Sequence, residues 1–159
     1  MIIFINGSIN SGKSTVSKIL AEKIERPVVV EIDSLSDFIK GSSIEEKIQI
    51  NLENAILLIR NFSKRSFNVI VPYPFSQKNY DYMIGELGDL NDNIFVFTLN
   101  PEKEVVLKNR GERELDDWEK QRIEYHYSIG INNPSFGVVI DNTNQAAKET
   151  AEIILNSIK

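Results

Sequence analysis

The chain has 159 residues, 42% hydrophobic and 26% charged, a balance typical of one folded domain with a single core. Its formal net charge of −5 argues against nucleic acid or an anionic membrane as a partner, because both bind basic surfaces. Cysteines are absent, which excludes disulfides and thiolate catalysis, and the single His126 excludes a multi-histidine metal site. No apolar run is long enough to span a membrane and the N-terminus lacks the basic region of a signal peptide, so we expect a cytoplasmic location.

The first predicted strand, Ile2–Ile5, leads directly into the octet GSINSGKS at Gly7–Ser14, which matches the phosphate-binding motif GxxxxGKS. Glycines allow the tight turn, and successive backbone N–H groups then surround anionic oxygens at the start of the next helix, predicted at 14–25. Lys13 can reach the β- and γ-phosphates of ATP, and the Ser14 hydroxyl can bind Mg²⁺, which prefers oxygen ligands. The predicted nucleotide-binding residues are Gly7, Asn10, Ser11, Gly12, Lys13, Ser14 and Thr15.

The second predicted strand, Val28–Ile32, is followed by Asp33. Ligand sites of parallel sheets lie at the carboxyl ends of strands, so this carboxylate is expected to face the phosphate loop. It could accept a proton from an attacking hydroxyl or help to position Mg²⁺ through water. The alternative is that Asp33 caps the next helix, but Ser34 and Asp37 already have the spacing of a capping box. We therefore predict that Asp33 is catalytic and contributes to the metal site.

A long amphipathic helix is predicted from Ile44 to Phe62, followed by a third strand over Asn68–Val71. That strand ends in Pro72 and not in the aspartate that many nucleotide hydrolases use to hold Mg²⁺, which favours a kinase with its carboxylate on the second strand. Four aromatic residues follow, and they could either wall an acceptor pocket or pack a loop onto the core. They are Tyr73, Phe75, Tyr80 and Tyr82.

The fourth strand, Ile94–Leu99, precedes a charge-rich region at about 108–128 that is poor in core-like residues and typical of a mobile helical lid. Arg110 and Arg113 would share one face of a helix there. An arginine can grip phosphates or stack on adenine, so we predict that at least one of the two is catalytic and that Arg110 also contacts the nucleotide. The alternative is a solvated helix, because glutamates surround both residues.

Arg122 and His126 lie four apart and could point toward an acceptor, although surface or packing roles are the simpler interpretation. A fifth strand is predicted at Gly137–Ile140 and a last helix at 145–158. The polar segment between them could face the base of ATP or merely start the helix. Strands that alternate with helices predict one α/β domain over residues 1–159, with a parallel sheet covered by helices on both faces.

These features together resemble the small P-loop kinases of the group that contains shikimate kinase, gluconate kinase and chloramphenicol phosphotransferase. The similarity runs from Gly7–Ser14 to the stretch at 140–143, nearly the whole chain. The tripeptide Asp33-Ser34-Leu35 is most similar to chloramphenicol phosphotransferase-like proteins, whose aspartate is the proposed general base, and their arginine-containing lid maps onto Arg110–Arg113. The resemblance implies a P-loop NTPase fold with a five-stranded parallel sheet in the order 2-3-1-4-5.

We therefore expect a Mg²⁺-dependent phosphotransferase that moves the γ-phosphate of ATP to a hydroxyl of a small molecule, with Lys13 and a lid arginine neutralising charge. A nucleoside or nucleotide kinase is one alternative, and Arg60, Lys64 and Arg65 could then supply charge for a second phosphate. A non-catalytic ATP-binding module is another. The loops near Asp33 carry few charges, so a largely neutral acceptor is expected, and the oligomeric state is left open.

Overall fold

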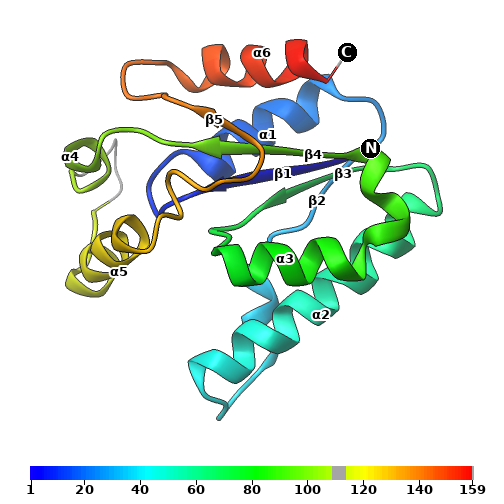
Figure 1. Cartoon of the computed structure of the whole chain (residues 1–159), viewed down its shortest axis with the longest axis horizontal. Coiled ribbons are helices and arrows are strands. Elements are labelled where there is room, and N and C mark those ends of the chain that lie inside the picture. The colour runs from blue at the N-terminus through cyan, green and yellow to red at the C-terminus, as the bar shows by residue number, and fades with distance from the viewer. Residues whose placement is uncertain (109–113, 159) are drawn as a thin grey trace.

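A computed structural model gives the structure of residues 1–108 and 114–158 (Figure 1). Its parallel sheet has the strand order β2-β3-β1-β4-β5, which confirms the predicted fold and order. The strands are β1 (Ile2–Gly7), β2 (Pro27–Val29), β3 (Asn68–Pro72), β4 (Ile94–Leu99) and β5 (Val138–Ile140). Within the described ranges, no helix is both long enough and apolar enough to cross a membrane.

Helices cover both faces of the sheet and the region beyond its carboxyl end (Figure 1). On one face lie α1 (Lys13–Lys23) and α6 (Ala147–Ser157), and on the other α2 (Ile44–Ser63) and α3 (Gln77–Glu86). Beyond the carboxyl ends of the strands lie the short α4 (Lys103–Val106) and α5 (Asp117–Ser128). Two 3₁₀ helices, η1 (Asp33–Phe38) and η2 (Gly88–Asn93), complete the described elements.

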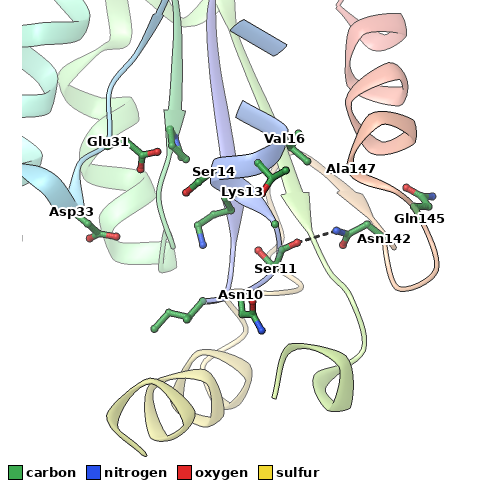
Figure 2. A pocket seen from close by; sticks show the side chains of 14 residues that line it. Asn10, Ser11, Lys13, Ser14, Val16, Glu31, Asp33, Asn142, Gln145 and Ala147 are labelled. Atoms are coloured by element: carbon green, nitrogen blue, oxygen red, sulfur yellow. Dashed lines mark hydrogen bonds between the residues drawn. The ribbon is translucent and has the colours of Figure 1, made fainter. Parts of the chain in front are cut away.

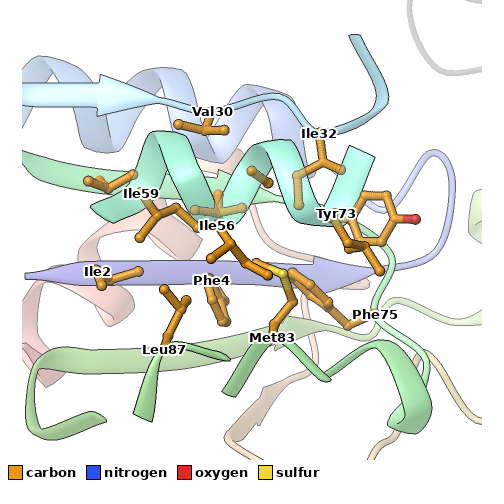
Figure 3. Packing of buried hydrophobic residues seen from close by; sticks show 14 of the residues in the cluster. Ile2, Phe4, Val30, Ile32, Ile56, Ile59, Tyr73, Phe75, Met83 and Leu87 are labelled. Atoms are coloured by element: carbon orange, nitrogen blue, oxygen red, sulfur yellow. The ribbon is translucent and has the colours of Figure 1, made fainter. Parts of the chain in front are cut away.

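The central strand β1 is buried on both faces because its side chains alternate between two cores. Ile2 and Phe4 pack toward α2 and α3, with Ile56, Met83 and other buried side chains (Figure 3). Ile3 and Ile5 pack toward α1 and α6 in a second cluster. This two-sided burial explains why the strand is a continuous apolar run in the sequence.

Asn6 interrupts the apolar run of β1 and joins three separate segments at the carboxyl end of the sheet. Its Nδ2 donates to Thr98 Oγ1 and to the carbonyl oxygen of Ile131, both at 3.0 Å, and its Oδ1 accepts from the backbone N–H of Phe75 at 2.8 Å. The side chain is fully buried. Because buried polar groups are costly unless they are paired, Asn6 fixes the loop after β3 and the segment after α5 against the strand that leads into the phosphate loop.

We expect Asn6→Ala to lower the free energy of unfolding by about 2–4 kcal/mol, since it leaves several buried partners without a hydrogen bond. Urea denaturation followed by circular dichroism would measure the change, with exposed Asn93→Ala as the matched control. A loss below about 0.5 kcal/mol, the usual scale of surface substitutions, would show that Asn6 is not a structural junction.

Two predicted features differ from the structure near the second strand. Regular pairing of β2 ends at Val29, although the N–H of Val30 still donates to the Ile70 carbonyl at 2.9 Å. The capping box expected from Ser34 and Asp37 is wrong, because these residues lie inside η1, which begins without a side-chain cap. Asp33 is the first residue of η1 and not its N-cap, so its carboxylate does not cap that helix.

Of the aromatic residues after β3, the two nearest the strand, Tyr73 and Phe75, pack into the core. Phe75 is fully buried, with its ring centroid 5.0 Å from both Phe4 and Tyr73. The ring of Tyr80 is partly buried and stacks on Phe136 at 3.7 Å. These rings therefore attach the loop after β3 and the segment before β5 to the core.

Candidate nucleotide and acceptor site

The phosphate loop joins β1 to α1 in the conformation that its glycines allow (Figure 2). Gly7 has φ 138°, and a Cβ there would lie 2.6 Å from the Leu99 carbonyl oxygen and 2.7 Å from Ser11 Oγ. Asn10 and Gly12 also have positive φ angles, of 61° and 101°. No larger residue fits at Gly7 without moving β4, so the first glycine of the motif is required by close packing.

The first turn of α1 is open to an anionic ligand. Gly12 is its N-cap and provides no side-chain hydrogen bond to the exposed N–H groups at the start of the helix. Lys13 and Ser14 are the first two helical residues, and the Lys13 ammonium donates to the Ser8 carbonyl at 2.7 Å. Free N–H groups, the helix dipole and a lysine together fit the phosphates of a nucleotide.

A cavity of about 430 Å³ opens in front of this loop (Figure 2). The loop itself forms one wall, Glu31 and Asp33 lie on a second side, and Asn142 and Gln145 lie on a third. Within the chain segments that the structure describes, the carboxyl ends of β1 and β2 and the loop after β5 therefore contribute to one cavity, as the general rule for parallel sheets requires.

Glu31 and Asp33 lie two residues apart, and both line the cavity beside Lys13. Burial, followed by the charge of Asp33, raises the pKa of Glu31, whereas Lys13, Lys18 and a hydrogen bond from Ser14 oppose the rise. The side chain of Asp33 is exposed toward the cavity, yet the protein surrounds it closely enough to raise its pKa, against the influence of Lys13 and Arg122. The pair is therefore held in an environment that disfavours its full ionisation until cations bind.

The oxygen atoms around Ser14 fit Mg²⁺ shared with nucleotide phosphates. Ser14, Glu31 and Asp33 supply hydroxyl and carboxylate oxygens, which this ion prefers. Among residues 1–108 and 114–158, no cluster of three or more histidine, aspartate or glutamate side chains would hold a metal by itself. That donor set fits an ion that takes its remaining ligands from phosphate and water.

Three contacts hold the phosphate loop from neighbouring elements. Asn142 Nδ2 donates to the Ser11 carbonyl at 3.0 Å. Asn10 Nδ2 donates to the carbonyls of Val106 at 2.9 Å and Lys108 at 3.0 Å, at the end of α4. These contacts fix the backbone of the loop and leave its inner side open to the cavity.

The third contact comes from α5. His126 is 2% exposed, and its Nδ1 shares a 3.2 Å hydrogen bond with Ser8 Oγ. Burial, then the charges of Arg122 and Lys13, lowers the pKa of His126 to about 4, so its imidazole is neutral at physiological pH. The packing role considered for His126 is the one that the structure shows, and its partner is the phosphate loop.

The predicted site residues divide into three groups. Asn10, Ser11, Gly12, Lys13, Ser14, Thr15 and Asp33 line the cavity, and Gly7 ends the strand behind it. Arg110 and Arg113, expected in catalysis, fall within 109–113 and so lie outside the described residues.

Arg60, Lys64 and Arg65, which were considered for a second phosphate, lie near the amino ends of the strands. Arg60 forms a bidentate pair with Asp89, with shortest distance 2.6 Å, in the η2 segment that precedes the amino end of β4. Lys64 and Arg65 follow the end of α2, shortly before β3 begins. They therefore lie away from the carboxyl ends of the strands, where the cavity opens.

Two residues near the cavity were missed or underrated from the sequence. Glu31 was not selected; the chain leaves the extended conformation at Ile32, and both Glu31 and Asp33 line the cavity. For Arg122 a surface or packing role was the simpler interpretation and a place near the acceptor the other, and its charge reaches Asp33, Tyr73 and His126.

Several known proteins that are similar to this chain are kinases by name. No protein-family model matches the chain. A cytidylate kinase from Archaeoglobus fulgidus is 28% identical over 171 aligned positions, which cover 100% of this chain and 95% of the relative.

Solved structures of kinases match the fold over almost the whole chain. A gluconokinase from Sinorhizobium meliloti 1021 has a TM-score of 0.71 at 16% identity and covers 98% of this chain and 90% of its own. The tunicamycin resistance protein of Deinococcus radiodurans has a TM-score of 0.67 at 16% identity, with coverages of 99% and 94%. The APS kinase CysC of Mycobacterium tuberculosis, solved with AMPPNP and APS, has a TM-score of 0.66 at 17% identity, with coverages of 98% and 95%. Two of these neighbours are kinases by name, and this chain shares their fold, which with its phosphate-loop motif is the P-loop NTPase fold.

Proposed function

We propose that the protein is an ATP- and Mg²⁺-dependent phosphotransferase that acts on a small molecule. The observation that carries this proposal is the convergence of Lys13, Ser14, Glu31 and Asp33 on one cavity in front of an open helix N-terminus. The fold shared with kinases and the whole-chain similarity to a cytidylate kinase support it. A loop that only joined a strand to a helix would not require two carboxylates on the cavity beside its lysine.

Each residue then has a distinct part in the transfer. Backbone N–H groups of Gly7–Ser14 bind the phosphates, while Lys13 leaves the Ser8 carbonyl and neutralises the charge that develops on the transferred group. Ser14 and Glu31 would hold Mg²⁺, which supplies charge neutralisation across the β- and γ-phosphates when bound. The acceptor oxygen attacks the γ-phosphorus, the bond to the bridging oxygen of ADP breaks, and Asp33 takes the proton of the hydroxyl.

The raised pKa of Asp33 suits the role of general base. A carboxylate with an ordinary pKa is a weak base at neutral pH, and a base whose pKa lies closer to the working pH transfers protons more efficiently. Burial raises the pKa of Asp33, and the charges of Lys13 and Arg122 oppose the rise.

A nucleotide kinase is the second candidate, because the curated relative acts on a nucleotide by its name and spans the whole chain. In that case the attacking atom is a phosphate oxygen, which is already ionised, and a general base is not required. Asp33 would then position the acceptor or the ion and would not take a proton. Lys64, Arg60 and Arg65 are poor candidates for its phosphate because of their place at the amino edge of the sheet.

Calorimetry and an ADP-release assay together test the proposal. We expect AMPPNP·Mg²⁺ to bind in a one-to-one ratio, and ADP release to rise when a panel of alcohols, sugars, nucleosides and nucleoside monophosphates is added with ATP. Binding of the analogue without ADP release from any acceptor, including a metabolite extract, would favour a non-catalytic nucleotide-binding module. Absence of analogue binding would reject the nucleotide site itself.

We also propose that α5 belongs to a lid that closes over bound nucleotide. Its inner side contributes Ile123 to a small apolar cluster with Val106 and Leu115, against which Ile9 of the phosphate loop packs, and His126 adds the hydrogen bond to Ser8. Such a small apolar contact is expected to open readily. Hydrogen exchange of residues 117–128 should therefore slow when AMPPNP·Mg²⁺ is added, whereas exchange in β1 and β4 stays unchanged. Equal and strong protection of α5 in both states would contradict the lid.

A further inference from the structure

Arg122 lies on the turn of α5 that precedes the contact with the phosphate loop. His126, four residues later, is bonded to Ser8, and residues four apart share one side of a helix. The contact of His126 therefore turns the side of α5 that carries Arg122 toward the phosphate loop. Electrostatics agree with this placement, because the charge of Arg122 opposes the burial that raises the pKa values of both Asp33 and Tyr73.

In the part of the chain that the structure describes, Arg122 forms no close ion pair, although its charge acts on Asp33. The side chain is half-buried, and its guanidinium carbon lies 4.9 Å from the centroid of the Tyr125 ring. Across the two described ranges, no aspartate or glutamate oxygen lies within 4.0 Å of its nitrogens, whereas Lys103, Lys120 and Arg60 all have acidic partners. An arginine stacked on an aromatic ring keeps its planar N–H edge for a ligand, and that edge matches a carboxylate or phosphate.

The position of this charge separates it from the donor phosphates. Lys13 and the N-terminus of α1 already provide positive charge on the nucleotide side of the cavity. Arg122 lies on the side of Asp33, the residue assigned to the acceptor, and it comes from a different element. A cation there would repel a cationic substrate and would bind an anionic group more strongly than a neutral one.

We propose that Arg122 binds an oxyanion, a carboxylate or a phosphate, carried by the acceptor, so that the substrate of this enzyme is an anionic molecule. The inference rests on the proposed phosphotransferase function and names its substrate class. It differs from the neutral acceptor expected from the sequence, which counted the arginines near the second and third strands and left out α5.

The first experiment asks whether an oxyanion binds at Arg122 when the phosphate loop is filled. The protein is saturated with AMPPNP·Mg²⁺ and then titrated with inorganic phosphate, and separately with acetate, as probes of the two chemistries. Calorimetry measures the binding of each probe. Trp118 is the single tryptophan of the chain and lies four residues from Arg122 on α5, so a change in its fluorescence shows that the probe binds near Arg122. We expect saturable binding of one probe in the wild type and at least a tenfold weaker affinity in Arg122→Gln.

Two further variants complete the comparison. Arg122→Lys keeps the charge but loses the planar fork, so its affinity should lie between those of the wild type and Arg122→Gln. Lys120→Gln removes a neighbouring cation of α5, one that is paired with Asp117, and should bind the probe like the wild type. Affinity for AMPPNP and the midpoint of thermal unfolding are measured for each variant, so that a folding defect is recognised.

The second experiment uses pairs of acceptors that differ by one anionic group, glucose with gluconate and cytidine with its 5′-monophosphate, in the ADP-release assay. We expect faster release with the anionic member and a rise in its KM, larger than any fall in kcat, in Arg122→Gln. Equal probe binding by wild type and Arg122→Gln, no probe binding by the wild type, or preference for the neutral members would each overturn the inference. Failure of AMPPNP to bind at all would instead reject the proposed function on which it rests.

Discussion

Replacing Lys13 with alanine is expected to lower phosphoryl transfer by about 10²–10³-fold and to weaken AMPPNP·Mg²⁺ binding, because the charge on the transferred group loses a preorganised cation. Lys13 begins α1, lines the cavity and donates to the Ser8 carbonyl, so its ammonium is already held beside the loop. The ADP-release assay would measure the rate of phosphoryl transfer, and calorimetry would measure the affinity for AMPPNP·Mg²⁺.

The control for Lys13→Ala is Lys64→Ala, which removes a lysine from the amino edge of the sheet after the end of α2. That variant should retain wild-type turnover and affinity. If Lys13→Ala also keeps both values, the assignment of a phosphate-binding loop is wrong, whatever the acceptor proves to be. Circular dichroism should show both variants folded, since neither side chain belongs to the core.

The residues of the phosphate loop could be predicted from the sequence because the motif places them at fixed spacing, even though distant elements hold the loop. Gly7 must be small to pass the Leu99 carbonyl, and Lys13 and Ser14 start α1 at fixed spacing from it. The long continuous apolar strands likewise follow from burial on both faces of the sheet. For these parts of the fold, the local pattern and the tertiary structure require the same residues.

The rest of the site depends on contacts between segments distant in the chain, and local patterns do not report those. From the sequence, His126 could point toward an acceptor, lie on the surface or pack in the core, and only the structure places it against Ser8, 118 residues earlier. Ser34 and Asp37 have the spacing of a capping box, but η1 follows the chain directly from β2 and leaves no frayed helix end for them to cap. Arg122 resembles a surface residue in sequence because the charges that it faces come from η1 and the loop after β3.

The sequence does not show how the charge-rich region around α5 packs. In the structure, Leu115 and Ile123 are buried against Val106, and Asp116 and Glu119 form a capping box at the start of α5. A good N-cap supports a short helix that has few apolar contacts. The lid remains a prediction.

Replacing Asp33 with asparagine is expected to cut phosphoryl transfer by about 10²–10⁴-fold, the usual contribution of a positioned general base, while AMPPNP affinity stays within a few-fold of wild type. The amide keeps the size and hydrogen-bonding capacity of the side chain but cannot take a proton. Asp37→Asn is the matched control, because it makes the same chemical change in the same 3₁₀ helix at an exposed position. Loss of activity in both variants would point to a structural effect of η1.

The same substitution should raise the stability of the nucleotide-free protein at neutral pH. Burial raises the pKa of Asp33 above its ordinary 3.8, so the folded state binds its proton more tightly than the unfolded state does. The corresponding stability is fully present below pH 3.8 and is lost as the pH rises through the folded-state pKa, which leaves an ionised carboxylate that costs stability at pH 7. Asp33→Asn removes that cost, so its thermal midpoint should exceed that of the wild type at pH 7, and the two should converge as the pH falls toward 4.

An enzyme that keeps a destabilising carboxylate in its cavity does so for the reaction, and a structural aspartate has no such reason to resist replacement. If Asp33 is the base, Asp33→Asn should therefore transfer phosphate more slowly than the wild type and also have a higher thermal midpoint. Slower transfer with lower stability would instead make Asp33 a structural support of η1. Unchanged transfer with an ionised acceptor would favour the nucleotide-kinase alternative, in which the attacking oxygen needs no base.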